Sequence, residues 1–103
     1  MAVDRVLGML SIAAKAGKLV SGNFMVEKAI AEGSAALVVL AEDTAKNTRK
    51  KIMDSCEYYK VRYIFYSDSE QLGKSIGKEF RKVVALTDEG MADSIIKKME
   101  VIG

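Results

Sequence analysis

An unbroken apolar run occupies residues 35–41 of this chain. It contains two adjacent valines and ends abruptly in Glu42, Asp43 and Thr44. A strand that exposes one face to water alternates apolar and polar residues, whereas a strand covered on both faces reads as a continuous apolar run. The run therefore predicts a buried strand that leads directly into the charged start of a helix.

Helical and extended patterns alternate along the rest of the chain. Apolar residues at helical spacing predict helices over about residues 2–16, 23–32, 44–59, 69–76 and from 88 onward. The extended segments are predicted over residues 18–20, 35–41, 61–66 and 83–87. Strands that alternate with helices predict an α/β fold, a three-layer α/β/α sandwich with a small mixed sheet of about four strands.

Glycine, serine, threonine and aspartate mark the predicted ends of these helices. Gly17 and Gly33 follow the first and second helices, where a left-handed residue commonly ends a helix. The predicted N-caps are Asp43 or Thr44 for the third helix, Asp68 or Ser69 for the fourth and Asp88 for the last.

The chain is long enough for one compact domain, over residues 1–103, and too short for two. Its net charge is +2 and 29% of its residues are charged, so it resembles neither a disordered polyelectrolyte nor a strongly basic tail. A nucleic-acid site therefore needs local clustering. Residues 44–52 hold four cations and no acids, and Lys78, Arg81 and Lys82 precede the last predicted strand.

The residue types present argue against several chemistries. The chain has no histidine, and Cys56 lies in a predicted helix interior, which favours a buried structural thiol over a nucleophile. A single cysteine fits a reducing cytoplasm, where we expect the protein. Glu42 and Asp43 lack the further spaced ligands of a metal site. We expect no enzymatic activity, cofactor, metal, small-molecule substrate or membrane span.

Two glycines punctuate the segment before the last strand. Gly73-Lys74-Ser75 resembles the end of a phosphate-binding P-loop, but Asp68 occupies the place of the earlier glycine that the motif needs. We interpret Gly73 and Gly77, four residues apart, as sites of close packing or turn geometry. Direct approach to a ligand is the alternative.

The cations Lys46 and Arg49 lie near the predicted start of the third helix, where free amides and the helix dipole also favour anions. A solvated helix face is the alternative interpretation. Nearby aromatic residues are predicted to lie mostly in the core rather than to stack on bases. These residues are Tyr58, Tyr59, Tyr63, Phe65 and Tyr66.

Three segments in combination resemble one protein family. They are residues 22–28, Leu37 to Asp43, and Leu72-Gly73-x-x-Ile76-Gly77. Together they resemble the kink-turn RNA-binding ribosomal proteins of the L-seven-Ae and L-thirty-e type, and within that family the small bacterial YlxQ-like members. The resemblance covers nearly the whole chain and implies an α/β/α sandwich that binds RNA without catalysis.

In that family a Gly-x-Asn-Glu-x-x-Lys segment opens the second helix and meets tandem sheared G·A pairs beside a bulge. Gly22 and Lys28 match this spacing, whereas Phe24 and Met25 occupy the asparagine and glutamate positions and Asn23 lies one place earlier. For Asn23 a helix cap is the alternative role. For Phe24, stacking on an unpaired base and burial in the core are the two interpretations.

The resemblance and the basic clusters together give a set of predicted RNA contacts. The set is Lys18, Ser21, Gly22, Asn23, Phe24, Lys28, Glu42, Asp43, Lys46, Arg49, Lys78, Phe80, Arg81 and Lys82. If the site exists, Gly22, Lys28, Asp43 and Arg81 should lie along one exposed edge.

Two functions follow from these features. The first is a non-catalytic RNA-binding protein, ribosomal or ribosome-associated, that recognises a kink-turn or bulged structured RNA. The second is a protein-interaction or assembly module that kept the fold but lost specific kink-turn recognition. In the second case Phe24 and Met25 would form an exposed apolar patch for a protein partner.

Overall fold

One mixed sheet of four strands forms the centre of the described chain, residues 4–102, in a computed structural model. The strands are β1 (Leu19–Ser21), β2 (Leu37–Leu40), β3 (Arg62–Phe65) and β4 (Val83–Leu86), in the spatial order β1-β4-β2-β3. β2 and β3 are parallel, and β4 runs antiparallel to both β1 and β2. The predicted small mixed sheet is thus confirmed.

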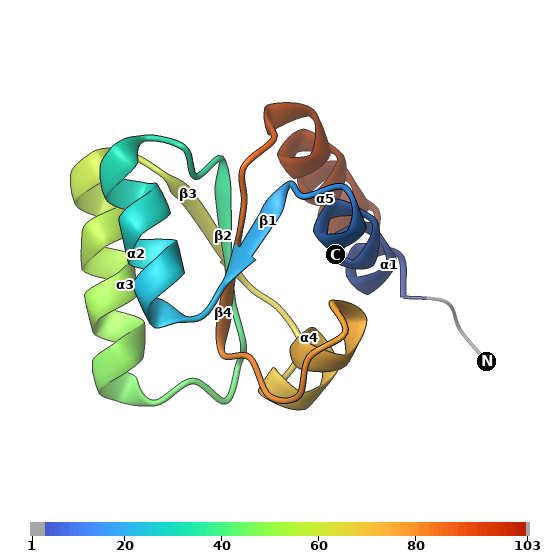
Figure 1. The fold of residues 1–103 in the computed structure, drawn as a ribbon, viewed down its shortest axis with the longest axis horizontal. Coiled ribbons are helices and arrows are strands. Elements are labelled where there is room, and N and C mark those ends of the chain that lie inside the picture. Colours follow the sequence, from blue (N-terminus) through green and yellow to red (C-terminus); the bar gives the residue numbers. More distant parts are fainter. Residues whose placement is uncertain (1–3, 103) are drawn as a thin grey trace.

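Helices cover both faces of this sheet (Figure 1). The helices within residues 4–102 are α1 (Arg5–Lys15), α2 (Asn23–Glu32), α3 (Lys46–Tyr59), α4 (Ser69–Ser75) and α5 (Glu89–Ile102). α2 and α3 lie side by side on one face, and α1, α4 and α5 lie on the other. The architecture is the three-layer α/β/α sandwich that the alternating pattern predicted.

Alternate residues of the central strands pack into two separate hydrophobic cores, one on each face of the sheet. Val38 and Leu40 of β2 pack with Ile30 of α2 and Ile52 of α3. Their neighbours in β2 pack on the other face, against α1, α4 and α5. All four residues of β2 are fully buried, which confirms the prediction of a strand covered on both faces.

Most predicted helix ends are confirmed. Gly33 ends α2 in the left-handed region, with φ of 80°. Asp68 caps α4 by accepting a hydrogen bond from the Gln71 amide at 2.8 Å, and Asp88 accepts one from Met91 at 3.0 Å. The first two residues of the predicted first helix, 2 and 3, lie outside the described residues.

Two predictions about side chains on and before α3 are wrong. Neither Asp43 nor Thr44 caps α3, because Ala45 occupies the N-cap and provides no side-chain hydrogen bond. Tyr58 and Tyr59 are exposed rather than core, with 79% and 48% of their surface accessible. The prediction of Cys56 as a buried thiol is confirmed.

The strand directions bring several loops to one end of the sheet, which we call the carboxyl end. β1, β2 and β3 all finish there, β4 begins there, and α2, α3 and α4 start from it. None of the helices in the described residues has the length and apolar character that a membrane crossing requires.

Candidate nucleic-acid interface

The start of α2 projects three exposed side chains at the carboxyl end of the sheet. Gly22 leaves β1 with φ of 90°, a backbone conformation that glycine adopts readily, and its amide donates to the Val83 carbonyl at 3.0 Å. Asn23, Phe24 and Met25 follow directly as the first turn of the helix. Phe24 is 77% exposed, so its interpretation as a core residue is wrong.

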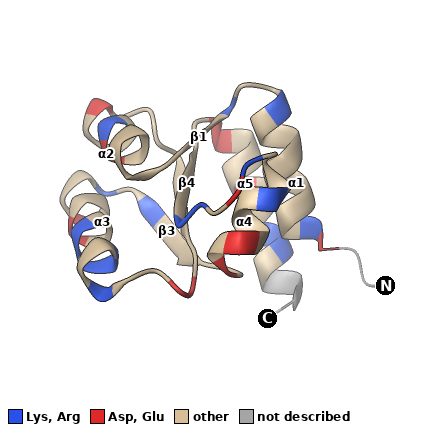
Figure 2. Ribbon diagram, turned by 60° about the horizontal axis from the view of Figure 1, so that its bottom comes forward, with Lys and Arg blue, Asp and Glu red and all other residues tan. Residues whose placement is uncertain are grey.

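The basic loop before β4, residues 78–82, lies against this helix start. The Arg81 guanidinium approaches the end of β1, with its Nε donating to the Ser21 hydroxyl at 3.4 Å. The Lys82 carbonyl accepts hydrogen bonds from the Ala41 amide at 2.8 Å and the Thr44 hydroxyl at 3.3 Å. Figure 2 shows basic residues both on this segment entering β4 and along α3. Phe80 is 64% exposed beside them.

Gly73 fixes the position of the basic loop. A Cβ atom added at Gly73 would lie 1.2 Å from the Glu79 carbonyl oxygen, so only a glycine permits this approach. The Gly73 carbonyl also accepts a hydrogen bond from the Lys78 amide at 2.8 Å. The interpretation of Gly73 as a close-packing residue is confirmed, and the packing serves the loop that carries Arg81.

Asp43 joins two of the loops at the carboxyl end. Its Oδ1 accepts from the Ser69 amide at 2.9 Å and its Oδ2 accepts from the Ser69 hydroxyl at 2.7 Å. These two hydrogen bonds support the start of α4, not of α3. The Ser69 hydroxyl is the main cause that lowers the pKa of Asp43 below its ordinary value of 3.8, and the Ser69 amide and Lys82 act in the same direction.

The lowered pKa predicts a contribution of Asp43 to stability that depends on pH. Because the folded state favours the carboxylate, this contribution is present above pH 3.8 and is lost as the pH falls through the lower folded value. Asp43→Asn should therefore lower the urea midpoint of unfolding at neutral pH. The difference in midpoint between this variant and wild type should become smaller in acid. Ser69→Ala should raise the Asp43 pKa, measured by carboxyl NMR titration. An unchanged Asp43 pKa in that variant would contradict the assignment.

Arg49 points inward rather than toward solvent. Its NH2 group donates to the carbonyls of Glu42 and Thr44, each at 3.2 Å, and its guanidinium lies 5.3 Å from the centre of the Phe65 ring. Its Nε is buried and has no hydrogen-bond partner among the described residues. Arg49 thus supports the loop after β2, although it was predicted from sequence as a phosphate contact.

The structure brings together most, but not all, of the predicted contacts. Those at the carboxyl end are Ser21, Gly22, Asn23, Phe24, Glu42, Asp43, Lys46, Arg49, Lys78, Phe80, Arg81 and Lys82. Lys28 is exposed and lies about 9 Å along α2 from Gly22, on the same helical face as Phe24. Lys18 lies at the opposite end of the sheet, where its carbonyl accepts a hydrogen bond from Thr87.

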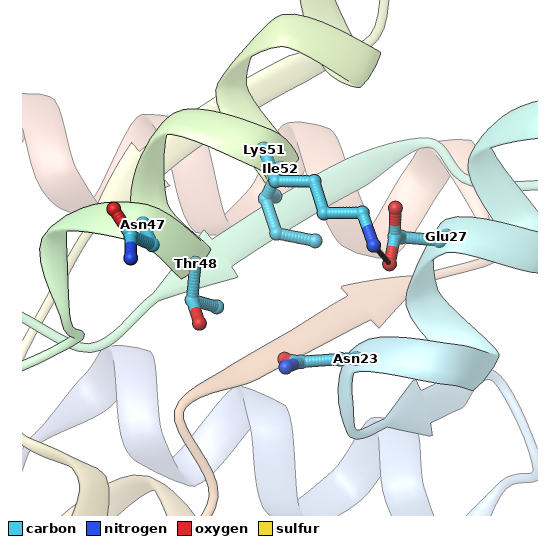
Figure 3. A pocket seen from close by; sticks show the side chains of 6 residues that line it. All are labelled: Asn23, Glu27, Asn47, Thr48, Lys51 and Ile52. Carbon is cyan, nitrogen blue, oxygen red and sulfur yellow. Dashed lines mark ion pairs between the residues drawn. The ribbon is translucent and has the colours of Figure 1, made fainter.

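A shallow pocket between the starts of α2 and α3 was not predicted from the sequence. It has a volume of about 200 Å³ and is lined by Asn23, Glu27, Asn47, Thr48, Lys51 and Ile52 (Figure 3). Asn47 and Thr48 are uncharged, so the basic pattern at the start of α3 gave no signal for them. No three His, Cys, Asp or Glu side chains in the described chain are grouped as a metal site requires.

The chain resembles proteins of known families and structures. Residues 4–96 match the model of the "Ribosomal protein L7Ae/L30e/S12e/Gadd45 family". The RNA-binding protein YlxQ of Bacillus subtilis is 47% identical over 92 residues, which cover 89% of this chain and 92% of that protein. The large ribosomal subunit protein eL8 of Cenarchaeum symbiosum is 30% identical, over 94% of this chain and 78% of its own length.

Two solved structures share the fold. A Bacillus halodurans protein of unknown function superposes with a TM-score of 0.89 and 31% identity, covering 93% of this chain and 97% of that one. The 15.5kD RNA binding protein of Giardia lamblia superposes with a TM-score of 0.77 over 100% of this chain and 94% of its own. Its 21% identity supports the fold alone.

Proposed function

Since this chain belongs to the ribosomal protein L7Ae/L30e/S12e/Gadd45 family, we propose that it binds structured RNA at the carboxyl end of its sheet. The observation that carries the proposal is the contact between the basic loop and the end of β1, which leads through Gly22 into α2: the Arg81 Nε lies 3.4 Å from the Ser21 hydroxyl. This contact places the exposed first turn of a helix beside Arg81 and Lys82. Phosphate contacts and base contacts can then be made by neighbouring elements.

The RNA that fits this surface best is a kink-turn or another bulged stem. Gly22 lacks a side chain, so an RNA backbone can approach the start of α2 closely. Phe24 is exposed in the first turn and its ring is available to stack on an unpaired base. Unpaired bases occur at bulges rather than in a regular duplex. We therefore propose a ribosomal or ribosome-associated role in which a bulged RNA is recognised.

A titration against two RNAs tests this function. One RNA carries a kink-turn, and the other is the same duplex with its bulge removed and its G·A pairs converted to Watson–Crick pairs. We expect at least tenfold tighter binding of the kinked RNA, about 1.4 kcal/mol. If about four phosphates are neutralised, the affinity should fall with a log–log salt slope of roughly −3 to −4.

Equal, salt-sensitive binding of both RNAs would contradict recognition of the bulge and leave only a phosphate-binding surface.

The second candidate function, a protein-interaction module, is favoured by the exposure of Phe24, Met25 and Phe80 at the same end. It predicts no RNA binding even at low salt, and capture of a partner that survives nuclease treatment. Replacing Phe24 and Met25 with serine would then abolish capture without changing the unfolding midpoint.

A further inference from the structure

β3 forms an open edge of the sheet. It pairs with β2 alone, so its other side meets no strand of the described chain. The Tyr66 amide donates to the Leu40 carbonyl at 2.9 Å, so the backbone of residue 66 faces β2. Backbone groups alternate between the two sides along a strand. Those of Ile64 therefore also face β2, whereas those of Tyr63 and Phe65 point to the open edge.

This edge has little of the protection that proteins give to an unpaired strand. Charged residues and prolines usually discourage a further strand from pairing with an edge. The residues from Tyr63 to Phe65 are aromatic or aliphatic. Arg62, the one charged residue of β3, pairs with Glu89 and Asp93 of α5 at 3.4 and 3.0 Å. The opposite edge, β1, is only three residues long, so β3 is the edge that accepts a further strand more readily.

One face of α3 runs beside this open edge. A groove of about 540 Å³ follows that face and is lined by Lys46, Arg49, Lys50, Met53, Asp54 and Glu57. Two contacts place the face against β3. The Arg49 guanidinium lies over the Phe65 ring, and the Tyr63 hydroxyl donates to the Glu57 carboxylate at 3.0 Å. A strand added at the edge would therefore lie beside this face of α3.

The charges on this face are divided between the two halves of α3. The first half carries Lys46 and Lys50, the second half carries Asp54 and Glu57, and the half-buried Met53 lies between them. A face whose two ends have opposite charge is complementary to itself when a second copy lies antiparallel to it. An extended peptide of a single charge would instead be attracted at one half and repelled at the other.

We propose that two copies of this chain associate by pairing their β3 strands antiparallel about a two-fold axis. The axis passes beside Ile64, so that the outward backbone groups of Tyr63 in each copy hydrogen bond to those of Phe65 in the other. The two four-stranded sheets then form one continuous sheet. The two α3 helices lie on the same face of it, side by side and antiparallel.

The same axis brings the charged halves of α3 together. Ile64 lies about 10 Å along β3 from Val61, and Met53 lies about 9 Å along α3 from Tyr59. Both are therefore at the same height above the turn that joins α3 to β3. The axis sets Met53 of one copy against Met53 of the other, and the basic half of each helix against the acidic half of its mate.

The inference goes beyond the proposed function and does not depend on it. α2 packs against β1 and β4, and the basic loop leads into β4, so neither lies at the β3 edge. Pairing of two copies leaves both uncovered. The antiparallel arrangement also directs the two carboxyl ends to opposite ends of the continuous sheet.

Reversal of the charges in each half of α3 tests this arrangement. The acidic variant combines Lys46→Glu with Lys50→Glu, and the basic variant combines Asp54→Lys with Glu57→Lys. In sedimentation equilibrium we expect wild type to dimerise with a micromolar dissociation constant, at the weak end for specific interfaces. Each variant alone should dimerise at least about tenfold more weakly, because like charges then face each other. An equimolar mixture of the two variants should restore association, because both halves are again complementary.

The matched control combines Lys15→Glu with Lys74→Glu. It makes the same change in net charge as the acidic variant, but on α1 and α4 in the other helical layer, and should dimerise as wild type does. Hydrogen exchange checks the strand pairing. The amides of Tyr63 and Phe65 should be protected in the dimer and exchange freely in either charge-reversed variant alone. Circular dichroism establishes that each variant is folded.

Several results would overturn the proposal. A wild-type protein that stays monomeric up to about 1 mM would leave the β3 edge to an extended segment of another protein. A dimer that both charge-reversed variants form as tightly as wild type, or in which the Tyr63 and Phe65 amides still exchange freely, would place the interface elsewhere. Loss of the dimer in the control variant would mean that net charge, and not this face, governs association.

Discussion

Gly73→Ala is expected to lower the free energy of unfolding by about 3 kcal/mol, the upper end of the usual cost of overpacking. The new Cβ would fall 1.2 Å from the Glu79 oxygen and 2.4 Å from its carbonyl carbon, both of them backbone atoms. No rotamer change relieves this overlap, so the loop at residues 78–82 or α4 itself must move. Urea unfolding followed by circular dichroism measures the loss.

The displaced loop should also weaken RNA binding, because Gly73 sets the position of Arg81 and Lys82. The loop is held to α4 by two hydrogen bonds, from the Lys78 amide to Gly73 and from the Arg81 amide to Ser69. Both would lengthen or break. Gly8→Ala is the control: Gly8 lies in α1 with open space around it, so alanine should stabilise the protein by about 0.5–1 kcal/mol. Equal midpoints for Gly73→Ala and wild type would contradict the close packing.

The fold was predictable because its elements follow local rules. The continuous apolar sequence of β2 predicts burial on both faces. Gly33 ends α2 and Asp68 caps the start of α4, and both do so through interactions with residues nearby in the sequence. The prediction that Asp43 caps α3 was wrong because its hydrogen-bond partner, Ser69, is 26 residues away in the sequence, beyond the reach of local rules. The prediction for Tyr58 was wrong because aromatic character was weighed above its position on the helix, away from the face of Ile52 and Cys56. Tyr59 has the spacing of that face but is the last residue of α3.

The candidate site was predictable in part for the same reason. The α2 start and the basic loop are each continuous in sequence, so they were found as segments. The pocket combines Asn23 with Thr48, which are 25 residues apart and meet only because β1 and β2 finish at the same end of the sheet. Lys18 was misplaced because a three-residue strand separates it from Gly22, a distance of about 10 Å along the sheet.

Arg49→Met is expected to lower the free energy of unfolding by about 2 kcal/mol, although the side chain belongs to a surface helix. The change removes two hydrogen bonds to the carbonyls of Glu42 and Thr44 and the cation–π contact with Phe65. Methionine keeps most of the apolar stem and eliminates the unpartnered Nε, so the loss reports the guanidinium contacts. Lys50→Met, which breaks only the exposed pair with Asp54, should change stability by less than about 0.5 kcal/mol.

RNA binding by Arg49→Met distinguishes two roles for Arg49: supporting the loop after β2, or contacting an RNA phosphate directly. Because the guanidinium is engaged by backbone carbonyls, Arg49 should release no counterion when RNA binds, and the variant should keep the wild-type salt slope while binding more weakly. Arg81→Met should instead reduce the slope by about one, as expected for one lost phosphate contact. A reduced slope for Arg49→Met would mean that Arg49 leaves the Glu42 and Thr44 carbonyls to meet the RNA, and the loop after β2 would then have to change conformation on binding.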